Sequence, residues 1–215
     1  EGLRFPLTPK HYAYLKICEG CINACSFCVI PKIKGKFVSL GVDLILKKVA
    51  GFSRNKISEL NIIGQDITGF GMDSGCGEDL ASLLLKIARR AKGINWIRLL
   101  YLNPGRISNA LLAVVKNEPK ICKYIDLPIQ HINERILKLM RRRITREETV
   151  RVIERIRKAI PGVALRTSII VGFPGESDRE FEELLEFIKE IKFDRLGAFS
   201  YSREEGTPSF SFKGQ

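Results

Sequence analysis

The chain has 215 residues, 45% of them hydrophobic, which suits one domain with a sizeable core. No run reaches the roughly 18 apolar residues that a membrane span needs, and no basic flank leads into an apolar stretch at the N-terminus, so neither a membrane anchor nor a secretory signal is expected. A formal net charge of +12 favours polyanionic partners. Because neither a membrane anchor nor a secretory signal is expected, we expect a cytoplasmic protein.

Short apolar, β-prone runs alternate with longer amphipathic runs. The predicted strands are Tyr12–Ile17, Leu60–Ile63, Trp96–Leu102, Tyr124–Leu127, Leu165–Val171 and Leu196–Ser200. The predicted helices are Val42–Ala50, Leu80–Ala91, Ile107–Val115, Glu134–Met140, Glu147–Ala159 and Arg179–Ile191. Two of these helices open with the spacing of a capping box, at Thr145 with Glu148 and at Ser177 with Glu180.

This alternation predicts an α/β fold with right-handed crossovers and a parallel sheet. The strands are continuously apolar, as in parallel strands that are covered on both faces. Composition alone does not choose between a doubly wound sheet and an open partial barrel. In both folds, ligands bind at the carboxyl ends of the strands.

Four of the six cysteines, Cys18, Cys21, Cys25 and Cys28, follow the first predicted strand closely. In a reducing cytosol such a cluster indicates metal binding. Three thiolates on one loop suit an iron–sulfur cluster with one open iron. With Cys18 added, the string could instead form a closed four-thiolate zinc site in a non-catalytic binding module. We interpret Cys18 as a small buried residue, and the isolated Cys76 and Cys122 as structural.

The string Cys21-Ile-Asn-Ala-Cys25-Ser-Phe-Cys28 resembles the signature of the radical S-adenosylmethionine (SAM) superfamily. The resemblance implies an open partial (β/α)6 barrel of the TIM-like kind. It also implies that Cys21, Cys25 and Cys28 hold a [4Fe–4S] cluster, whose fourth iron binds the amino and carboxylate groups of SAM. An electron from the cluster then cleaves SAM to a 5′-deoxyadenosyl radical. Phe27 matches the aromatic position near the adenine.

The same resemblance assigns further SAM contacts to the ends of later strands. Gln65 would lie near the SAM amino group, Gln130 near the ribose, and Arg142 on the carboxylate, since arginine offers a planar, bidentate fork. Arg141 and Arg143 are the alternatives to Arg142. Ser168 is expected near the ribose, and Gly172 at a turn close to the ligand. His131 is expected to be a structural residue, with a catalytic base as the alternative.

The chain also resembles the methylthiotransferase family over nearly its whole length. The resemblance rests on Tyr14–Cys21, on Ile136–Arg142, on Gly172–Glu176 and on Tyr201–Pro208. Leu40, where the family usually has Arg or Lys, and Cys18, where it has Ser, depart from the pattern. The resemblance implies that residues 1–215 form the central radical SAM domain, without the N-terminal domain that carries a second [4Fe–4S] cluster and without the C-terminal TRAM domain. It also implies an electron-donor protein as a partner.

Four details resemble the RimO type, which modifies an aspartate β-carbon of ribosomal protein S-twelve, more than the tRNA-modifying MiaB type. They are Gln65-Asp66-Ile67-Thr68, Pro128-Ile129-Gln130-His131, Arg166-Thr167-Ser168 and Glu204-Glu205-Gly206-Thr207. The segment Asn133–Lys158 carries ten Lys or Arg against four Glu, a net charge of +6. This stretch is either a surface for nucleic acid or a solvated helical face. It contains no Phe, Tyr or Trp on which a base could stack.

Overall fold

The computed structural model describes residues 9–75 and 77–214, and in them six parallel strands alternate with helices. The strands are β1 (Tyr12–Lys16), β4 (Glu59–Ile63), β5 (Trp96–Leu99), β6 (Tyr124–Asp126), β7 (Ala164–Val171) and β8 (Arg195–Ser200). The helices that follow them are α2 (Val42–Arg54), α3 (Leu80–Arg90), α4 (Asn109–Asn117), α5 (Glu134–Leu139), α6 (Arg146–Ala159) and α7 (Asp178–Ile191). Each predicted strand and helix is therefore confirmed.

Several short elements were not predicted. They are the hairpin β2 (Cys18–Glu19) with β3 (Val38–Ser39), helix α1 (Ile30–Lys34), and the 3₁₀ turns η1 (Ile67–Gly69), η2 (Pro104–Arg106) and η3 (Pro208–Ser211). Most of them lie in the connections at the carboxyl ends of the strands. Their hydrophobic patterns are too short for a period to be read.

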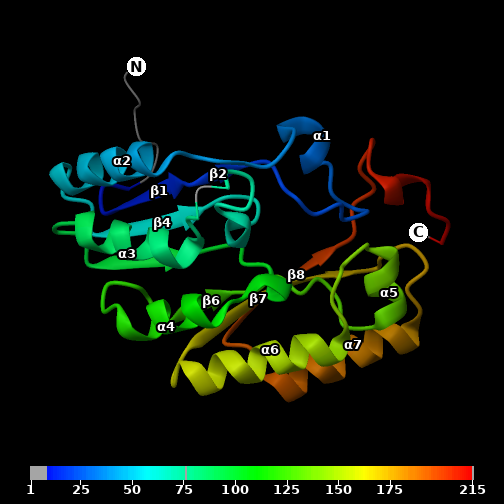
Figure 1. The fold of residues 1–215 in the computed structure, drawn as a ribbon. Helices are drawn as coiled ribbons and strands as arrows, with labels where there is room; N and C mark the ends of the chain where they lie inside the picture. Colours follow the sequence, from blue (N-terminus) through cyan, green and yellow to red (C-terminus); the bar gives the residue numbers. More distant parts are fainter. Residues whose placement is uncertain (1–8, 76, 215) are drawn as a thin grey trace.

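The strands follow one another as β1-β4-β5 and β6-β7-β8, with all neighbours parallel. A parallel bridge between Ile97 and Ile121 links the two halves, and the Leu102 N–H donates to the Asp126 carbonyl at 3.0 Å. The described pairings give β1 and β8 one strand neighbour each, so the curved sheet stays open between them (Figure 1). The predicted open partial (β/α)6 barrel is confirmed.

The helices cover the convex side of the sheet, where the main hydrophobic core lies. In Figure 1, α6 and α7 run along the lower edge of the molecule, and α2 and α3 flank the half that holds β1 and β4. None of the helices among the described residues is long and apolar enough to cross a membrane. Cys122 is half-buried and is not in a disulfide, while Cys76 lies outside the described residues.

The concave side differs from the apolar surface that was predicted. In β7, Leu165, Thr167 and Ile169 are buried, while the residues that alternate with them are only partly buried. Polar side chains pair across neighbouring strands on the concave side: Arg98 bonds Glu59 at 2.7 Å, and Arg166 bonds Asp126 at 2.7 Å. The strands therefore form one wall of a polar interior rather than the middle layer of an apolar sandwich.

Both predicted capping boxes are present. The Glu148 N–H donates to Thr145 Oγ1 at 3.1 Å, and the Thr145 N–H donates back to Glu148 Oε2 at 2.8 Å. In the second box, the Ser177 N–H donates to Glu180 Oε2 at 2.9 Å. Arg135 of α5 also bonds Glu180, from Nε at 2.7 Å and from Nη2 at 2.5 Å. These bonds from Arg135 lower the pKa of Glu180 to about 2 despite the opposing effect of burial.

Because the folded pKa of Glu180 lies below the ordinary 4.5, the pair stabilises the protein above pH 4.5 and loses this effect as the pH falls toward 2. We expect Arg135→Ala to lower the free energy of unfolding by about 1–2 kcal/mol at pH 7, a value reduced for screening because Arg135 is 54% exposed. The difference from the unsubstituted protein should shrink by pH 3, as measured by urea unfolding. Arg151→Ala, in the exposed pair with Glu147, is the control and should cost under about 0.5 kcal/mol. An Arg135 effect that does not change with pH would contradict this account.

Candidate active site

The three cysteines of the signature lie on the loop between β2 and α1, and all three are partly buried. Ser26 anchors this loop to the end of α5: its N–H donates to the Met140 carbonyl at 3.0 Å, and its hydroxyl to the Leu139 carbonyl at 2.7 Å. The Ser209 N–H donates to the Ser26 carbonyl at 2.9 Å. Segments far apart in the sequence therefore hold the loop in place.

A cavity of about 410 Å³ opens beside the cysteines at the carboxyl ends of the strands. Seven of the nine predicted site residues line it: Cys21, Cys25, Phe27, Cys28, Gln65, Gln130 and Arg142. Lys16, Asn23, Ile30, Ile63, Gly64 and Tyr101 complete the lining. The parallel strands thus bring these side chains together at the edge of the sheet where ligands bind.

Ser168 and Gly172 are not among the residues that line this cavity. Ser168 lies within β7, and its carbonyl accepts the Gln130 N–H at 2.9 Å, so it contacts the backbone of a lining residue. Gly172 follows β7 with φ of +69°, a conformation that favours glycine. The next residue, Phe173, donates its N–H to Glu176 Oε2 at 2.9 Å, which holds the turn.

Cys18 is fully buried and is not among the residues that line the cavity. Its thiol is directed at the Asp66 carbonyl at 3.8 Å, and burial raises its pKa to about 12. It packs so closely under Gly64 that a Cβ at that position would come within 2.4 Å of its sulfur. Glycine is therefore required at position 64, and Cys18 is the buried packing residue that we expected.

Burial also raises the pKa of Cys21 and Cys28 above the usual value. Cys21, Cys25 and Cys28 line one cavity, while the Cys18 thiol is buried against the Asp66 carbonyl and is not among the lining residues. A closed zinc site of this string needs all four thiolates, whereas three thiolates leave one iron of a cubane open. The three thiols of the cavity therefore fit an iron–sulfur cluster.

Gln65 and Arg142 give the cavity polar groups that could hold a ligand. Gln65 Oε1 is buried and has no hydrogen-bond partner within the part of the chain that the structure describes. Arg142 donates from Nη2 to the Pro128 carbonyl at 2.7 Å, and its Nη1 lies 3.9 Å from Cys25 Sγ. An orphaned acceptor and a guanidinium with donors to spare suit a ligand that has both ammonium and carboxylate groups.

Backbone strain gathers around the same cavity. Tyr101, Gln130 and Arg141 have φ of +62°, +74° and +55°, in the left-handed region that residues other than glycine rarely adopt. Tyr101 and Gln130 line the cavity, and Arg141 immediately precedes Arg142. Such strain persists only where the surrounding structure fixes it, and it concentrates at binding sites.

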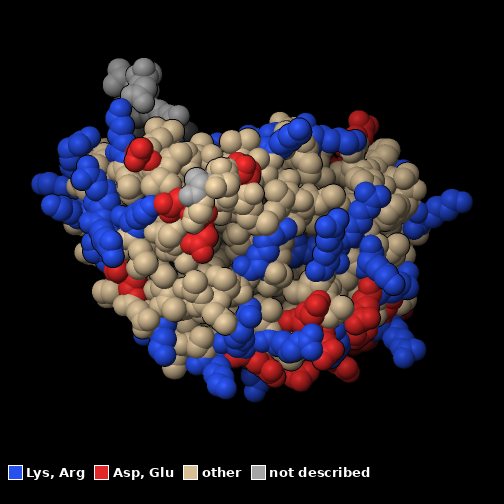
Figure 2. All heavy atoms as spheres, viewed as in Figure 1, with Lys and Arg blue, Asp and Glu red and all other residues tan. Residues whose placement is uncertain are grey.

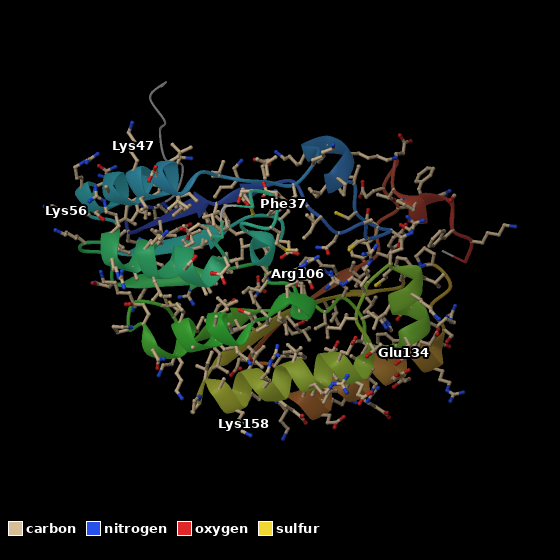
Figure 3. The ribbon with its side chains drawn as sticks, viewed as in Figure 1. Phe37, Lys47, Lys56, Arg106, Glu134 and Lys158 are labelled. Atoms are coloured by element: carbon tan, nitrogen blue, oxygen red, sulfur yellow. The ribbon has the colours of Figure 1, made fainter. Side chains whose placement is uncertain are left out.

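The sequence did not single out a polar network beside Cys21. Asn23 bonds Cys21 and Asp66, and Arg106 bonds both Asn23 and Asp66. Arg106 comes from η2 and lies near the middle of the molecule (Figure 3). A signal for Asn23 was its place inside the cysteine motif. Nothing in the sequence pairs it with Arg106, 83 residues further on.

His131 is a structural residue in this fold. It is fully buried; its Nδ1 accepts the Asn133 N–H at 3.0 Å, and its Nε2 lies 3.5 Å from Glu176 Oε1. Burial opposes ionisation of Glu176, yet the neighbouring His131 imidazole and the hydrogen bond from the Phe173 N–H at 2.9 Å keep its pKa below the usual value. His131 therefore fixes the turn after β7 and does not line the cavity.

The family model described as "Radical SAM superfamily" matches residues 15–188, most of the chain. The chain belongs to the radical SAM superfamily. Its enzymes use a [4Fe–4S] cluster and SAM, and the cysteine loop, Gln65 and Arg142 of this radical SAM chain fit both groups. The match therefore agrees with the chemistry of the cavity.

Curated relatives cover almost the whole of this radical SAM chain. One, the ribosomal protein uS12 methylthiotransferase RimO of Geotalea uraniireducens, is 49% identical over 96% of this chain and 46% of its own length. The protein of the same name from Thermodesulfovibrio yellowstonii is 48% identical over 100% of this chain and 50% of its own. The chain thus spans about half the length of the curated relatives it matches.

Solved radical SAM structures share the fold at low identity. The methyltransferase TsrM from Kitasatospora setae, with cobalamin and a [4Fe–4S] cluster bound, matches with a TM-score of 0.75 and 17% identity, over 92% of this chain and 38% of its own. Coproporphyrinogen III oxidase (HemN) from Escherichia coli matches with a TM-score of 0.67 and 20% identity, over 89% and 44%. These likenesses confirm the partial barrel.

Part of the basic stretch Asn133–Lys158 forms a solvated helical face, and another part forms a positive surface of the kind that could meet nucleic acid. Arg146 pairs with Glu183, and Arg151 with Glu147, as on a solvated helical face. Arg141 and Arg143 instead line a second hollow, together with Arg106 and Arg142, directly beside the cysteine loop. Figure 2 shows Lys and Arg side chains across the middle of this face, with carboxylates gathered below them. The radical SAM cavity thus has a basic surface at its side.

Proposed function

We propose that this chain is the catalytic core of a radical SAM methylthiotransferase that acts on an aspartate β-carbon of ribosomal protein uS12 (S-twelve). The observation that supports it most is the cavity that joins three cysteine thiols to Gln65 and Arg142. The near-complete coverage by relatives named as uS12 methylthiotransferases supports the substrate. Residues 1–215 would form the central domain, working in the cytoplasm with an electron-donor protein.

Different residues of the cavity would hold the cluster and the separate groups of SAM. Cys21, Cys25 and Cys28 would hold the cluster, which when bound supplies the electron for reductive cleavage of SAM and hence the radical that removes a substrate hydrogen. Arg142 would hold the SAM carboxylate, and the orphaned Gln65 oxygen would accept a hydrogen bond from the SAM amino group. Gln130 would contact the ribose and Phe27 the adenine. Ser168 of β7 would support Gln130 through its carbonyl, and Gly172 would form the turn that follows this strand.

Transfer RNA is the alternative substrate, favoured by the arginines beside the cysteine loop. Charge of this kind attracts any polyanion and does not select a base. The segment Asn133–Lys158 offers no aromatic ring for stacking a splayed nucleotide. A ribosomal protein embedded among RNA phosphates would benefit from the same positive surface. We therefore favour the protein substrate.

The experiment compares both substrates under one set of conditions. The natural full-length polypeptide is used, since the named relatives are about twice as long as this chain. Incubated anaerobically with SAM and a reductant, it should add a methylthio group to uS12 and leave isopentenyl-adenosine tRNA unchanged, as measured by mass spectrometry. A Cys25→Ala variant is the control and should modify neither. Modification of the tRNA alone would overturn the substrate and leave the radical SAM chemistry in place.

A further inference from the structure

Asn23 makes two contacts with the sulfur of one cluster cysteine. Its backbone N–H lies 3.4 Å from Cys21 Sγ, and its side-chain Nδ2 lies 3.3 Å from the same atom. Both distances suit N–H donors to sulfur. Asn23 lines the cavity together with Cys21, so the contact is part of the site itself.

The orientation of the Asn23 amide is fixed by charged partners. Nδ2 donates to Asp66 Oδ2 at 2.8 Å, and Oδ1 accepts from Arg106 Nη2 at 2.9 Å. A flipped amide would put its oxygen against the Asp66 carboxylate and its N–H groups against the Arg106 guanidinium, both of which are unfavourable. The electrostatics therefore hold the N–H group toward the sulfur.

Arg106 and Asp66 are themselves firmly held. Arg106 Nη1 bonds Asp66 Oδ2 at 2.6 Å, and the Asp66 side chain is only 4% exposed. Asp66 Oδ1 accepts the Thr68 N–H at 3.1 Å, which closes the turn after β4. The support for Asn23 thus comes from the start of η1, where Asp66 is the N-cap residue, and from η2, both outside the cysteine loop.

We propose that Asn23 is a positioning residue that raises the reduction potential of the cluster, and that Arg106 acts through it. The inference rests on the proposed cluster at Cys21, Cys25 and Cys28. When one electron enters a cluster, no bond breaks and negative charge builds up on its sulfurs. Hydrogen-bond donors aimed at a ligand sulfur stabilise this reduced state, so the potential rises.

Asn23 is a donor whose side-chain contribution can be removed by substitution. Cys28 accepts from the N–H of Ile30, which belongs to the backbone and survives any side-chain change. Arg142, near Cys25, is already assigned to SAM in the proposed function. The Asn23 amide is neutral, so its loss changes hydrogen bonding at the sulfur without changing the formal charge of the site.

The test measures the midpoint potential of the reconstituted cluster by redox titration followed by EPR. Asn23→Ala should keep the iron content and shift the potential to a more negative value. Arg106→Lys keeps the positive charge but loses the guanidinium fork that holds Asn23 and Asp66, so it should shift the potential in the same direction by less. The double variant should shift it no further than Asn23→Ala alone. Ser26→Ala is the matched control, because it removes a hydrogen bond of the same loop that does not reach a cysteine. Its potential should equal that of the unsubstituted chain.

An unchanged potential in Asn23→Ala with full iron would overturn the proposal. So would an equal shift in Ser26→Ala, because the effect would then be general to the loop. If Asn23→Ala loses the cluster, Arg106→Lys decides, because it keeps the formal charge of the site: a negative shift supports the proposal and an unchanged potential overturns it. If the unsubstituted chain binds no iron, both the proposed function and this inference fail. If it binds iron but the variants do not shift the potential, only the inference fails.

Discussion

Replacement of Cys25 by alanine is expected to abolish the cluster and with it the cleavage of SAM. The three cysteines lie on one loop and face one cavity, and no spare thiol lines it, since Cys18 is packed away under Gly64 within the described part of the chain. A cubane that loses one of three protein ligands has no local replacement. Iron should fall from about four per chain to near background, and formation of 5′-deoxyadenosine should fall with it. Cys21→Ala and Cys28→Ala should behave alike.

Cys18→Ser is the control that separates a cluster from a closed zinc site. Its sulfur is fully buried, is directed at the Asp66 carbonyl, and is not among the atoms that line the cavity. Iron content and the EPR signal in the presence of SAM should therefore match those of the unsubstituted chain. Tight zinc that is lost equally from the Cys18 and Cys25 variants would instead establish the four-thiolate binding module and remove the basis for catalysis.

The order of strands and helices could be predicted from the sequence because their hydrophobic patterns are clear and capping residues mark where helices begin. The capping boxes at Thr145 and Ser177 mark where two helices begin, and both form as expected. The composition of the strands did not decide between a doubly wound sheet and an open partial barrel. Its curvature depends on contacts such as Ile97 with Ile121, between residues that no local pattern pairs.

The polar interior escaped prediction for a related reason. Arg166 and Asp126 interrupt otherwise apolar strands, and a single charged residue in such a run does not tell which partner it meets. The strand register places Asp126 directly beside Arg166 and so creates the pair. The Asn23 network depends in the same way on loops that meet only in the folded chain.

The choice among Arg141, Arg142 and Arg143 could not be made from a run of identical residues. In the structure, α5 ends at Leu139, and Arg141 adopts φ of +55°, which redirects the chain. Of the three arginines, Arg142 lines the cavity with the cysteines, while Arg141 and Arg143 line the neighbouring hollow. A left-handed residue of this kind is set by tertiary contacts and has no local signature outside glycine.

Arg142→Ala is expected to weaken SAM binding roughly 10- to 150-fold while leaving the iron content unchanged. The Arg142 guanidinium uses Nη2 for the Pro128 carbonyl and Nη1 for Cys25 Sγ. A guanidinium has five N–H groups, so donors remain for a charge-assisted bond with the SAM carboxylate. A hydrogen bond to a charged group is worth about 1.5–3 kcal/mol, which gives the stated range. Anaerobic equilibrium dialysis with the reconstituted cluster measures the affinity.

Arg141→Ala and Arg143→Ala are the matched controls, because they remove the same charge from adjacent positions. Bulk attraction between a basic surface and SAM would weaken binding similarly in all three variants. A direct bond predicts a large loss for Arg142 and changes of less than about threefold for its neighbours, since exposed charges contribute under about 1 kcal/mol. Unchanged affinity in Arg142→Ala, or a larger loss in either neighbour, would contradict the assignment of Arg142 to the SAM carboxylate. Another residue would then make that contact.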